Sequence, residues 1–162
     1  KIKKKVKSKF KKLLLVSDGI NINILPKLAQ KLHLFLKKEY KIFIRPHPIE
    51  DVENYKNNKF YNYFHIDYEK NLYKSLSDKE VVVAEMSTVL YNALNIVPKI
   101  FIFRTIKSKF NIPSHPFQEI KSVEDLIIKI KSNKKLNTNI DLKKYFYSNW
   151  KKNFKRYLKK EL

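Results

Sequence analysis

Three short polar stretches could bind and act on an anion, and each directly follows an apolar run. They are Ser17-Asp18-Gly19, Arg45-Pro46-His47-Pro48 and Glu85-Met86-Ser87-Thr88. Hydroxyl, imidazole and guanidinium groups all donate hydrogen bonds to phosphate oxygens. The chain has no cysteine, and its His, Asp and Glu residues show no metal-site spacing. The pattern therefore predicts phosphate binding by protein groups, with no metal and no cysteine nucleophile.

His47 is held between two prolines. Pro48 keeps His47 out of helical angles, and Pro46 does the same for Arg45, so the imidazole stands on a stiff, extended loop. A neutral or charged imidazole can donate to a phosphate oxygen, and a charged one also offsets the negative charge on a departing phosphate. Arg45 can bind the same anion or a carboxylate. The alternative is a rigid turn that carries a surface histidine.

Ser87 and Thr88 stand where a strand pattern changes to a helix pattern. A helix N-terminus offers unpaired N–H groups and a partial positive charge, and two hydroxyls beside it would complete a phosphate seat. The alternative is that Ser87 is only a helix cap. Gly19, the single glycine of the chain, predicts a turn with positive φ after the first strand.

The other histidines carry weaker signals. His33 lies within an apolar helix pattern and is expected to be structural, His65 lies in or near a strand with no partner to assign, and His115 in a loop could be a second ligand contact. The sequence contains no P-loop, no GxGxxG and no GxSxG motif.

Short apolar strands alternate with helical patterns along the chain, which predicts an α/β fold with a doubly wound, mostly parallel sheet and helices on both faces. We expect strands at 13–18, 41–48, 61–67, 80–85 and 99–104, helices at 24–40, 68–77, 86–97 and 122–130, and a loop at 106–120. Residues Leu25, Leu28, Leu32, Phe35 and Leu36 should form the buried face of the first helix. Since ligands sit beyond the carboxyl ends of such strands, His47 and Ser87-Thr88 should face a common anion within about 10 Å.

Length and charge set the wider limits. A chain of 162 residues suits one domain, which we place at 12–135. Residues 1–11 are expected to form a basic linker or tail, or alternatively a binding arm. Residues 136–162 are expected to form a basic aromatic helix. That helix would pack on this domain or on a missing partner domain, or lie on a membrane surface. No apolar run approaches the roughly 18 residues of a membrane span. The formal net charge of +21 draws the chain toward anionic membranes, nucleic acid or phosphorylated substrates.

The strand ending in Arg-Pro-His-Pro, followed by a later strand leading into Glu-Met-Ser-Thr, resembles the donor-binding half of certain GT-B glycosyltransferases. The similar families are the CDP-glycerol (teichoic-acid type) transferases, the bacterial sialyl- and polysialyltransferases, and related capsule and lipooligosaccharide transferases. Their "HP" motif matches His47-Pro48, and their "Ser-Ser/Thr" motif matches Ser87-Thr88, with Glu85 ahead of it and Ala93 in the helix behind. Met86 replaces the usual aromatic spacer.

The resemblance implies a Rossmann-like domain that forms one half of a GT-B fold and works in metal-independent transfer from a CMP- or CDP-linked donor, with no cofactor. His47 would be the catalytic group that steadies the leaving phosphate. The donor would be bound by Ser87, Thr88, Arg45, Pro48, Glu85, Ser17, Asp18 and Gly19. The acceptor would be a glycan or a lipid-linked molecule. A second Rossmann-like domain would precede Lys1, and the protein would work in the cytoplasm, at the inner face of the membrane.

Two other functions stay open at this point. A basic α/β domain could bind nucleic acid, with lysines on phosphates and aromatic rings on bases. The aromatic residues lie mostly in apolar strand and helix patterns, however, where a core position is the ordinary one, so nucleic acid is the weaker expectation. The domain could also be a non-catalytic scaffold whose site has decayed.

Overall fold

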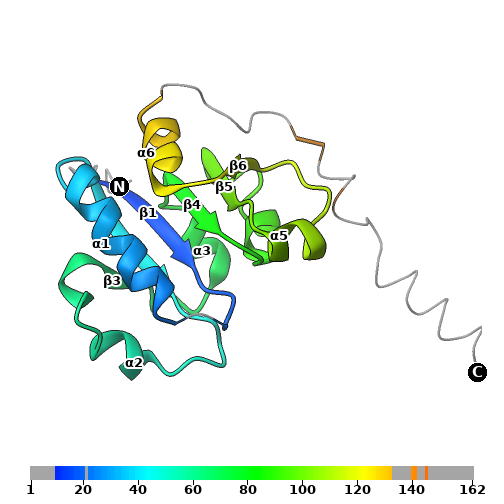
Figure 1. Ribbon diagram of the computed structural model, residues 1–162. Helices are drawn as coiled ribbons and strands as arrows, with labels where there is room; N and C mark the ends of the chain where they lie inside the picture. The colour runs from blue at the N-terminus through cyan, green and yellow to red at the C-terminus, as the bar shows by residue number, and fades with distance from the viewer. Residues whose placement is uncertain (1–9, 21, 133–139, 142–144, 146–162) are drawn as a thin grey trace, which may run out of the picture.

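The computed structural model describes residues 10–20, 22–132, 140, 141 and 145. Within them one parallel sheet has the strand order β3-β2-β1-β4-β5-β6 (Figure 1). Its strands are β1 Lys11–Val16, β2 Tyr40–Arg45, β3 His65–Ile66, β4 Val81–Ala84, β5 Lys99–Phe103 and β6 Gln118–Ile120. Each strand is parallel to its neighbours.

Helices connect the strands and cover both faces of the sheet. They are α1 Ile24–Leu36, α2 Val52–Lys56, α3 Leu72–Leu76, α4 Val89–Asn92, α5 Ile106–Asn111 and α6 Val123–Lys131, with a 3₁₀ turn at Tyr61–Tyr63. Figure 1 shows α1 and α6 on one face and α3 on the other. The expected α/β class, with helices on both sides of a parallel sheet, is confirmed.

Successive side chains of a strand point to opposite faces of the sheet, so the domain has two hydrophobic cores, one on each face. Leu13 and Leu15 of β1 face α1 and α6, whereas Leu14 and Val16 face the side of α3 and α4. All four side chains are buried. A central strand that is apolar on both sides is the usual pattern of a parallel sheet covered twice, which explains why LLLV reads as a continuous apolar run.

The strand order places a switch point beside β1. The chain passes from β1 outward to β2 and β3, and then returns to the other side of β1 as β4. In such sheets the crevice for ligands lies outside the carboxyl ends of the strands where the order reverses. The loops after β1, β2 and β4 all open at this edge.

Several expected boundaries were wrong. The helix expected over 86–97 is only Val89–Asn92, and the chain turns at Asn95, whose φ is 60°. The strand expected over 61–67 shrinks to His65–Ile66 behind a 3₁₀ turn, and the helix expected over 68–77 to Leu72–Leu76. Phe35, expected in the core, is 62% exposed because it lies on the outer side of α1.

The expected loop at 106–120 was also wrong, since it contains α5 and β6. Thr105 and Ser108 form a reciprocal capping box that starts α5. Ser122 caps α6, as its hydroxyl accepts from the Asp125 N–H at 3.1 Å.

The expected C-terminal helix over 136–162 lies outside the described residues except for Ile140, Asp141 and Tyr145, and the basic tail lies outside them up to residue 9. Ile140 and Tyr145 pack on the core of the α4 face. Among the described residues, no helix has the length and apolarity to cross a bilayer.

Candidate functional site

The loops after β1, β2 and β4 meet at the carboxyl edge of the sheet. The Ser17 N–H donates to the Arg45 carbonyl at 3.0 Å, so the first two loops are joined where they leave the sheet. Neighbouring strands lie roughly 4.8 Å apart, which separates the exits of β2 and β4 by about 10 Å across β1. The fold thus brings His47 and Ser87 to one edge, on either side of Gly19. A shared anion between them stays a prediction.

His47 packs directly against Gly19. A Cβ atom at Gly19 would lie 3.1 Å from both Cγ and Nδ1 of the imidazole and 3.2 Å from Cδ1 of Ile49. Gly19 also has φ +82°, in the left-handed region that side chains rarely adopt. The single glycine of the chain is therefore required twice, by its own backbone and by the imidazole that covers it.

One ring nitrogen of His47 is engaged within its own loop. The Ile49 N–H donates to Nδ1 at 3.4 Å, which favours the tautomer with the proton on Nε2. Among the described residues Nε2 has no hydrogen-bond partner, so it can donate to a ligand. The half-buried ring is thus oriented by the loop and by Gly19.

Glu50, which the sequence analysis missed, holds this loop together. Its Oε2 accepts from the His47 N–H at 2.6 Å and from the Tyr55 hydroxyl at 3.0 Å, and its Oε1 accepts from the Ser17 hydroxyl at 2.8 Å. Its N–H donates to the His47 carbonyl at 2.9 Å. One carboxylate therefore links the loops after β1 and β2 to α2. An acidic residue three positions after a histidine in a proline-fixed turn was the available signal.

Two of the residues that donate to Glu50 are buried. Tyr55 is fully buried, and Ser17 is 3% exposed. Burial raises the pKa of the Tyr55 hydroxyl well above its ordinary value, and the nearby Glu50 carboxylate raises it further. Tyr55 is therefore a neutral donor at any physiological pH.

Arg45 is turned to the other side of β2. Its Nη1 donates to Asp67 Oδ2 at 3.2 Å and to the Glu69 carbonyl at 2.8 Å. Asp67 also accepts from the Ser75 hydroxyl. These contacts fix the end of β3 and engage one terminal nitrogen of the Arg45 guanidinium. Binding of the donor anion by Arg45 stays a prediction.

Ser87 and Thr88 lie at the start of α4, as expected. The Val89 N–H donates to the Ser87 hydroxyl oxygen at 3.3 Å, which leaves the hydroxyl proton free to donate. Thr88 is the exposed N-cap residue, and its side chain makes no capping hydrogen bond. Because α4 spans only four residues, its dipole contributes less than a longer helix would, and the hydroxyls carry more of the proposed phosphate binding.

Glu85 binds within the protein. Its Oε1 accepts from the Thr105 hydroxyl at 2.6 Å. Thr105 is in turn the N-cap of α5. Glu85 thereby ties the loop that carries Ser87 to the start of α5. Pro48 is exposed beside His47.

A cavity of about 630 Å³ opens at the carboxyl ends of β1, β4 and β5, next to the first turns of α1. Its walls are mostly apolar, and its polar members include Ser17, Asp18, Glu85, Thr105, Lys27 and Lys31. Asp18 Oδ1 accepts from the Ile20 N–H at 3.1 Å, whereas Asp18 Oδ2 is buried without a hydrogen-bond partner. The cavity adjoins the loop on which His47 rests, and its volume is that of an ordinary small-molecule site.

The remaining histidines make other contacts. His33 stacks edge-on against Tyr63, and His65 lies on Phe43. His115 repeats the local geometry of His47, since its Nδ1 accepts from the Phe117 N–H at 3.2 Å, but its side chain is only 4% exposed. Burial, followed by the Arg104 charge, lowers the pKa of His115. In the described part of the chain, no cluster of three or more His, Cys, Asp or Glu side chains could hold a metal ion.

No protein-family model and no curated protein matches the chain. Two solved structures of the wall teichoic acid polymerase TagF with CDP-glycerol do share its fold. They align over 80% of this chain with TM-scores of 0.58 and 0.55 and identities of 18% and 19%. The fold is one half of a GT-B fold. The chain spans about a third of the length of TagF, as it covers 33% of the first structure and 34% of the second.

Proposed function

We propose that this domain binds the nucleotide donor in a transferase that uses a CDP- or CMP-linked substrate. The observation that carries the proposal is the position of His47 over Gly19, with Nδ1 engaged and Nε2 free, at the edge where the Ser87 loop also ends. The shared fold with TagF, solved with CDP-glycerol, supports a cytidine nucleotide. The rest of the enzyme, including the acceptor site, would lie in another domain.

Two reactions fit the same site. In glycerophosphate transfer, an acceptor oxygen attacks the outer phosphorus of CDP-glycerol, the bridging P–O bond breaks, and CMP leaves. In glycosyl transfer, an acceptor oxygen attacks the anomeric carbon, and the bond to the nucleotide phosphate breaks. Negative charge grows on the departing phosphate in both reactions, and the acceptor loses a proton to a base.

The described residues would act on the departing phosphate rather than on the acceptor. His47 Nε2 would donate to the departing phosphate, and the hydroxyls of Ser87 and Thr88 would bind the same group. Glu50 would act as a positioning residue, because it binds the His47 backbone and Ser17. This arrangement stabilises charge with protein donors alone. The TagF similarity favours CDP-glycerol over a sialic acid donor.

Thermal-shift titration tests the proposal. CDP should raise the melting temperature at moderate salt, since a ligand at 100 times its Kd adds roughly 2.7 kcal/mol to the free energy of unfolding. UDP and a single-stranded oligonucleotide serve as comparisons. Stabilisation by the oligonucleotide alone, with steep salt dependence, would contradict the proposal and favour nucleic-acid binding.

A further inference from the structure

The helix α5 has an inverted arrangement of polar and apolar side chains. Ser108 is 0% exposed, whereas Ile106 is 88% and Phe110 84% exposed. Ile106 and Phe110 are four residues apart and so share one side of the helix. A surface helix ordinarily buries its apolar side and exposes its polar side. The exposed side of α5 is therefore suited to contact an apolar surface rather than water.

Local hydrogen bonds hold α5 in this orientation. The Ser108 N–H donates to the Thr105 hydroxyl at 3.1 Å, and the Ser108 hydroxyl accepts from the Thr105 N–H at 2.9 Å. Ile112, four residues after Ser108, anchors the inner side in the core. Rolling α5 to bury Phe110 would break the capping box and expose Ile112, so the exposure of Ile106 and Phe110 is built into the fold.

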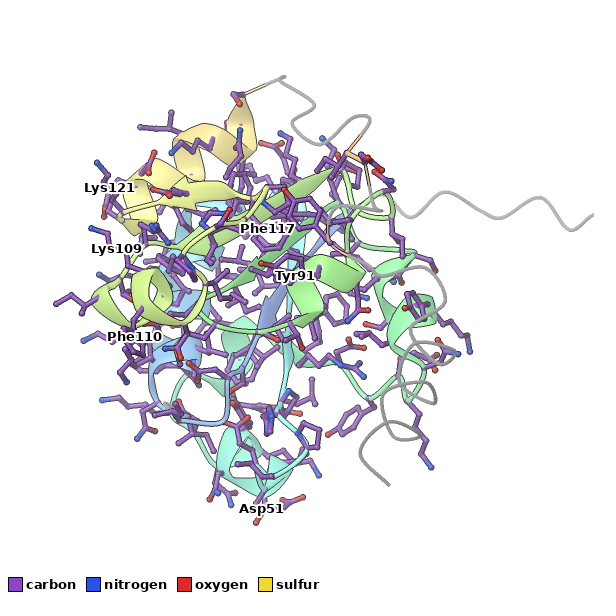
Figure 2. All side chains as sticks on the ribbon, turned by 90° about the vertical axis from the view of Figure 1, so that its right-hand side faces the viewer. Asp51, Tyr91, Lys109, Phe110, Phe117 and Lys121 are labelled. Atoms are coloured by element: carbon purple, nitrogen blue, oxygen red, sulfur yellow. The ribbon has the colours of Figure 1, made fainter. Side chains whose placement is uncertain are left out.

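The surroundings of α5 are basic. Lys107 and Lys109 lie on the same helix, and no acidic residue occurs between Glu85 and Glu119. Figure 2 shows Lys109, Phe110 and Lys121 projecting from the same side of the molecule. None of these three lysines forms an ion pair within the described residues. The α5 surface, defined as Ile106, Lys107, Lys109, Phe110 and Lys121, thus combines two apolar side chains with three lysines. Lys121 also lies near the Asp125 carboxylate, which accepts from its backbone N–H at 3.1 Å.

We propose that the α5 surface docks on an anionic lipid bilayer. Ile106 and Phe110 would enter the boundary between headgroups and acyl chains, and the lysines would contact anionic headgroups. A mixture of basic and apolar side chains matches the surface of an anionic bilayer. A protein domain bound to α5 would instead have to place acidic groups opposite the lysines. The Thr105–Glu85 hydrogen bond ties α5 to the Ser87 loop, so the bilayer would lie beside the carboxyl edge. This inference goes beyond donor binding and does not depend on the donor.

Vesicle flotation with the full chain tests this surface. The wild type should bind vesicles of phosphatidylcholine with phosphatidylglycerol and should not bind pure phosphatidylcholine vesicles. The Ile106→Ser/Phe110→Ser variant keeps the net charge, so any loss reports insertion of the two side chains. We expect its partition coefficient to fall roughly ten-fold or more, because each buried apolar group contributes to interfacial binding.

The matched control is Leu34→Ser/Phe35→Ser, which removes similar side chains, 59% and 62% exposed, from α1 on the other face of the sheet. It should bind vesicles as the wild type does. Circular dichroism melting and CDP titration of all three proteins check that fold and donor site are retained. Absence of wild-type binding would overturn the proposal, as would an unchanged partition coefficient of the α5 variant.

Discussion

The imidazole of His47 covers Gly19 so closely that a Cβ atom there would lie 3.1 Å from two ring atoms. Two residues from different loops are thereby fitted to each other at the carboxyl edge of the sheet. The position of the ring depends on the absence of a side chain in the neighbouring loop. A change at Gly19 should consequently act on His47.

Gly19→Ala should lower the free energy of unfolding by about 1–2 kcal/mol, the cost of a left-handed conformation for a residue with a side chain. It should also weaken CDP binding, because the new methyl group displaces the imidazole. Urea unfolding and calorimetric titration measure the two effects.

Asn95→Ala is the matched control for this substitution. Asn95 also has positive φ, at 60°, and lies after α4, away from His47. It should lose stability but keep its CDP affinity. Equal loss of affinity in both variants would show that Gly19 has no specific relation to the donor site.

Glu50→Gln should loosen the loop that presents His47. The side chain loses its charge, and one of its two acceptor oxygens becomes an NH2 donor. It can therefore no longer accept both from the Ser17 hydroxyl at one end and from the His47 N–H and Tyr55 hydroxyl at the other. Hydrogen bonds to a charged group contribute about 1.5–3 kcal/mol each, so we expect a clear fall in the urea midpoint and a weaker affinity for CDP.

Tyr55→Phe removes only one donor to Glu50 and leaves its bonds to His47 and Ser17 intact. It should cost about 1 kcal/mol of stability with little change in CDP affinity. A CDP affinity of Glu50→Gln equal to that of Tyr55→Phe would contradict the positioning role of Glu50.

The fold of this domain follows closely from its apolar patterning. The runs before Ser17 and Glu85 are buried strands because they are apolar on both faces, whereas the run before Arg45 alternates between buried and less buried side chains. The polar residues after all three runs mark the carboxyl edge. The segment 106–120 was harder to predict, because α5 exposes Ile106 and buries Ser108, contrary to ordinary helix patterning. Glu50 was missed because its hydrogen bonds join residues as far apart as 33 positions in sequence. The hydrogen bonds from Arg45 to Asp67 and to the Glu69 carbonyl were also unforeseen, because nothing in sequence links these residues.

The stability of the domain should fall on mild acidification because of His115. Burial lowers its folded pKa below the ordinary 6.5. The unfolded chain therefore takes up the proton first, and the free energy of unfolding falls as pH drops from 6.5 toward the folded pKa. Above the ordinary value, both states are neutral and this contribution to stability is complete.

His115→Asn tests that pH dependence, because asparagine retains an acceptor for the Phe117 N–H without a titrating ring. The variant should show a shallower loss of urea midpoint between about pH 7 and pH 5 than the wild type does. His65, whose pKa is also lowered by burial, remains in both proteins. Identical slopes would mean that His115 makes no contribution.

Thr105→Val should remove both the cap of α5 and the bond to Glu85. Loss of an N-cap costs about 1 kcal/mol, and the Ser87 loop loses its link to α5. Ser122→Ala, which removes the cap of α6, is the control. Both variants should melt earlier, and only Thr105→Val should also bind CDP more weakly.

The most direct measurement is a double-mutant cycle for CDP affinity with His47→Ala, Ser87→Ala and the combined variant. If both side chains bind one phosphate, each single change weakens binding, and the two effects are non-additive by about 0.5 kcal/mol or more. His65→Ala and Ser77→Ala, exposed positions away from this edge, should bind as the wild type does. Unchanged affinity in either His47→Ala or Ser87→Ala, or strictly additive losses, would contradict a shared anion between His47 and Ser87.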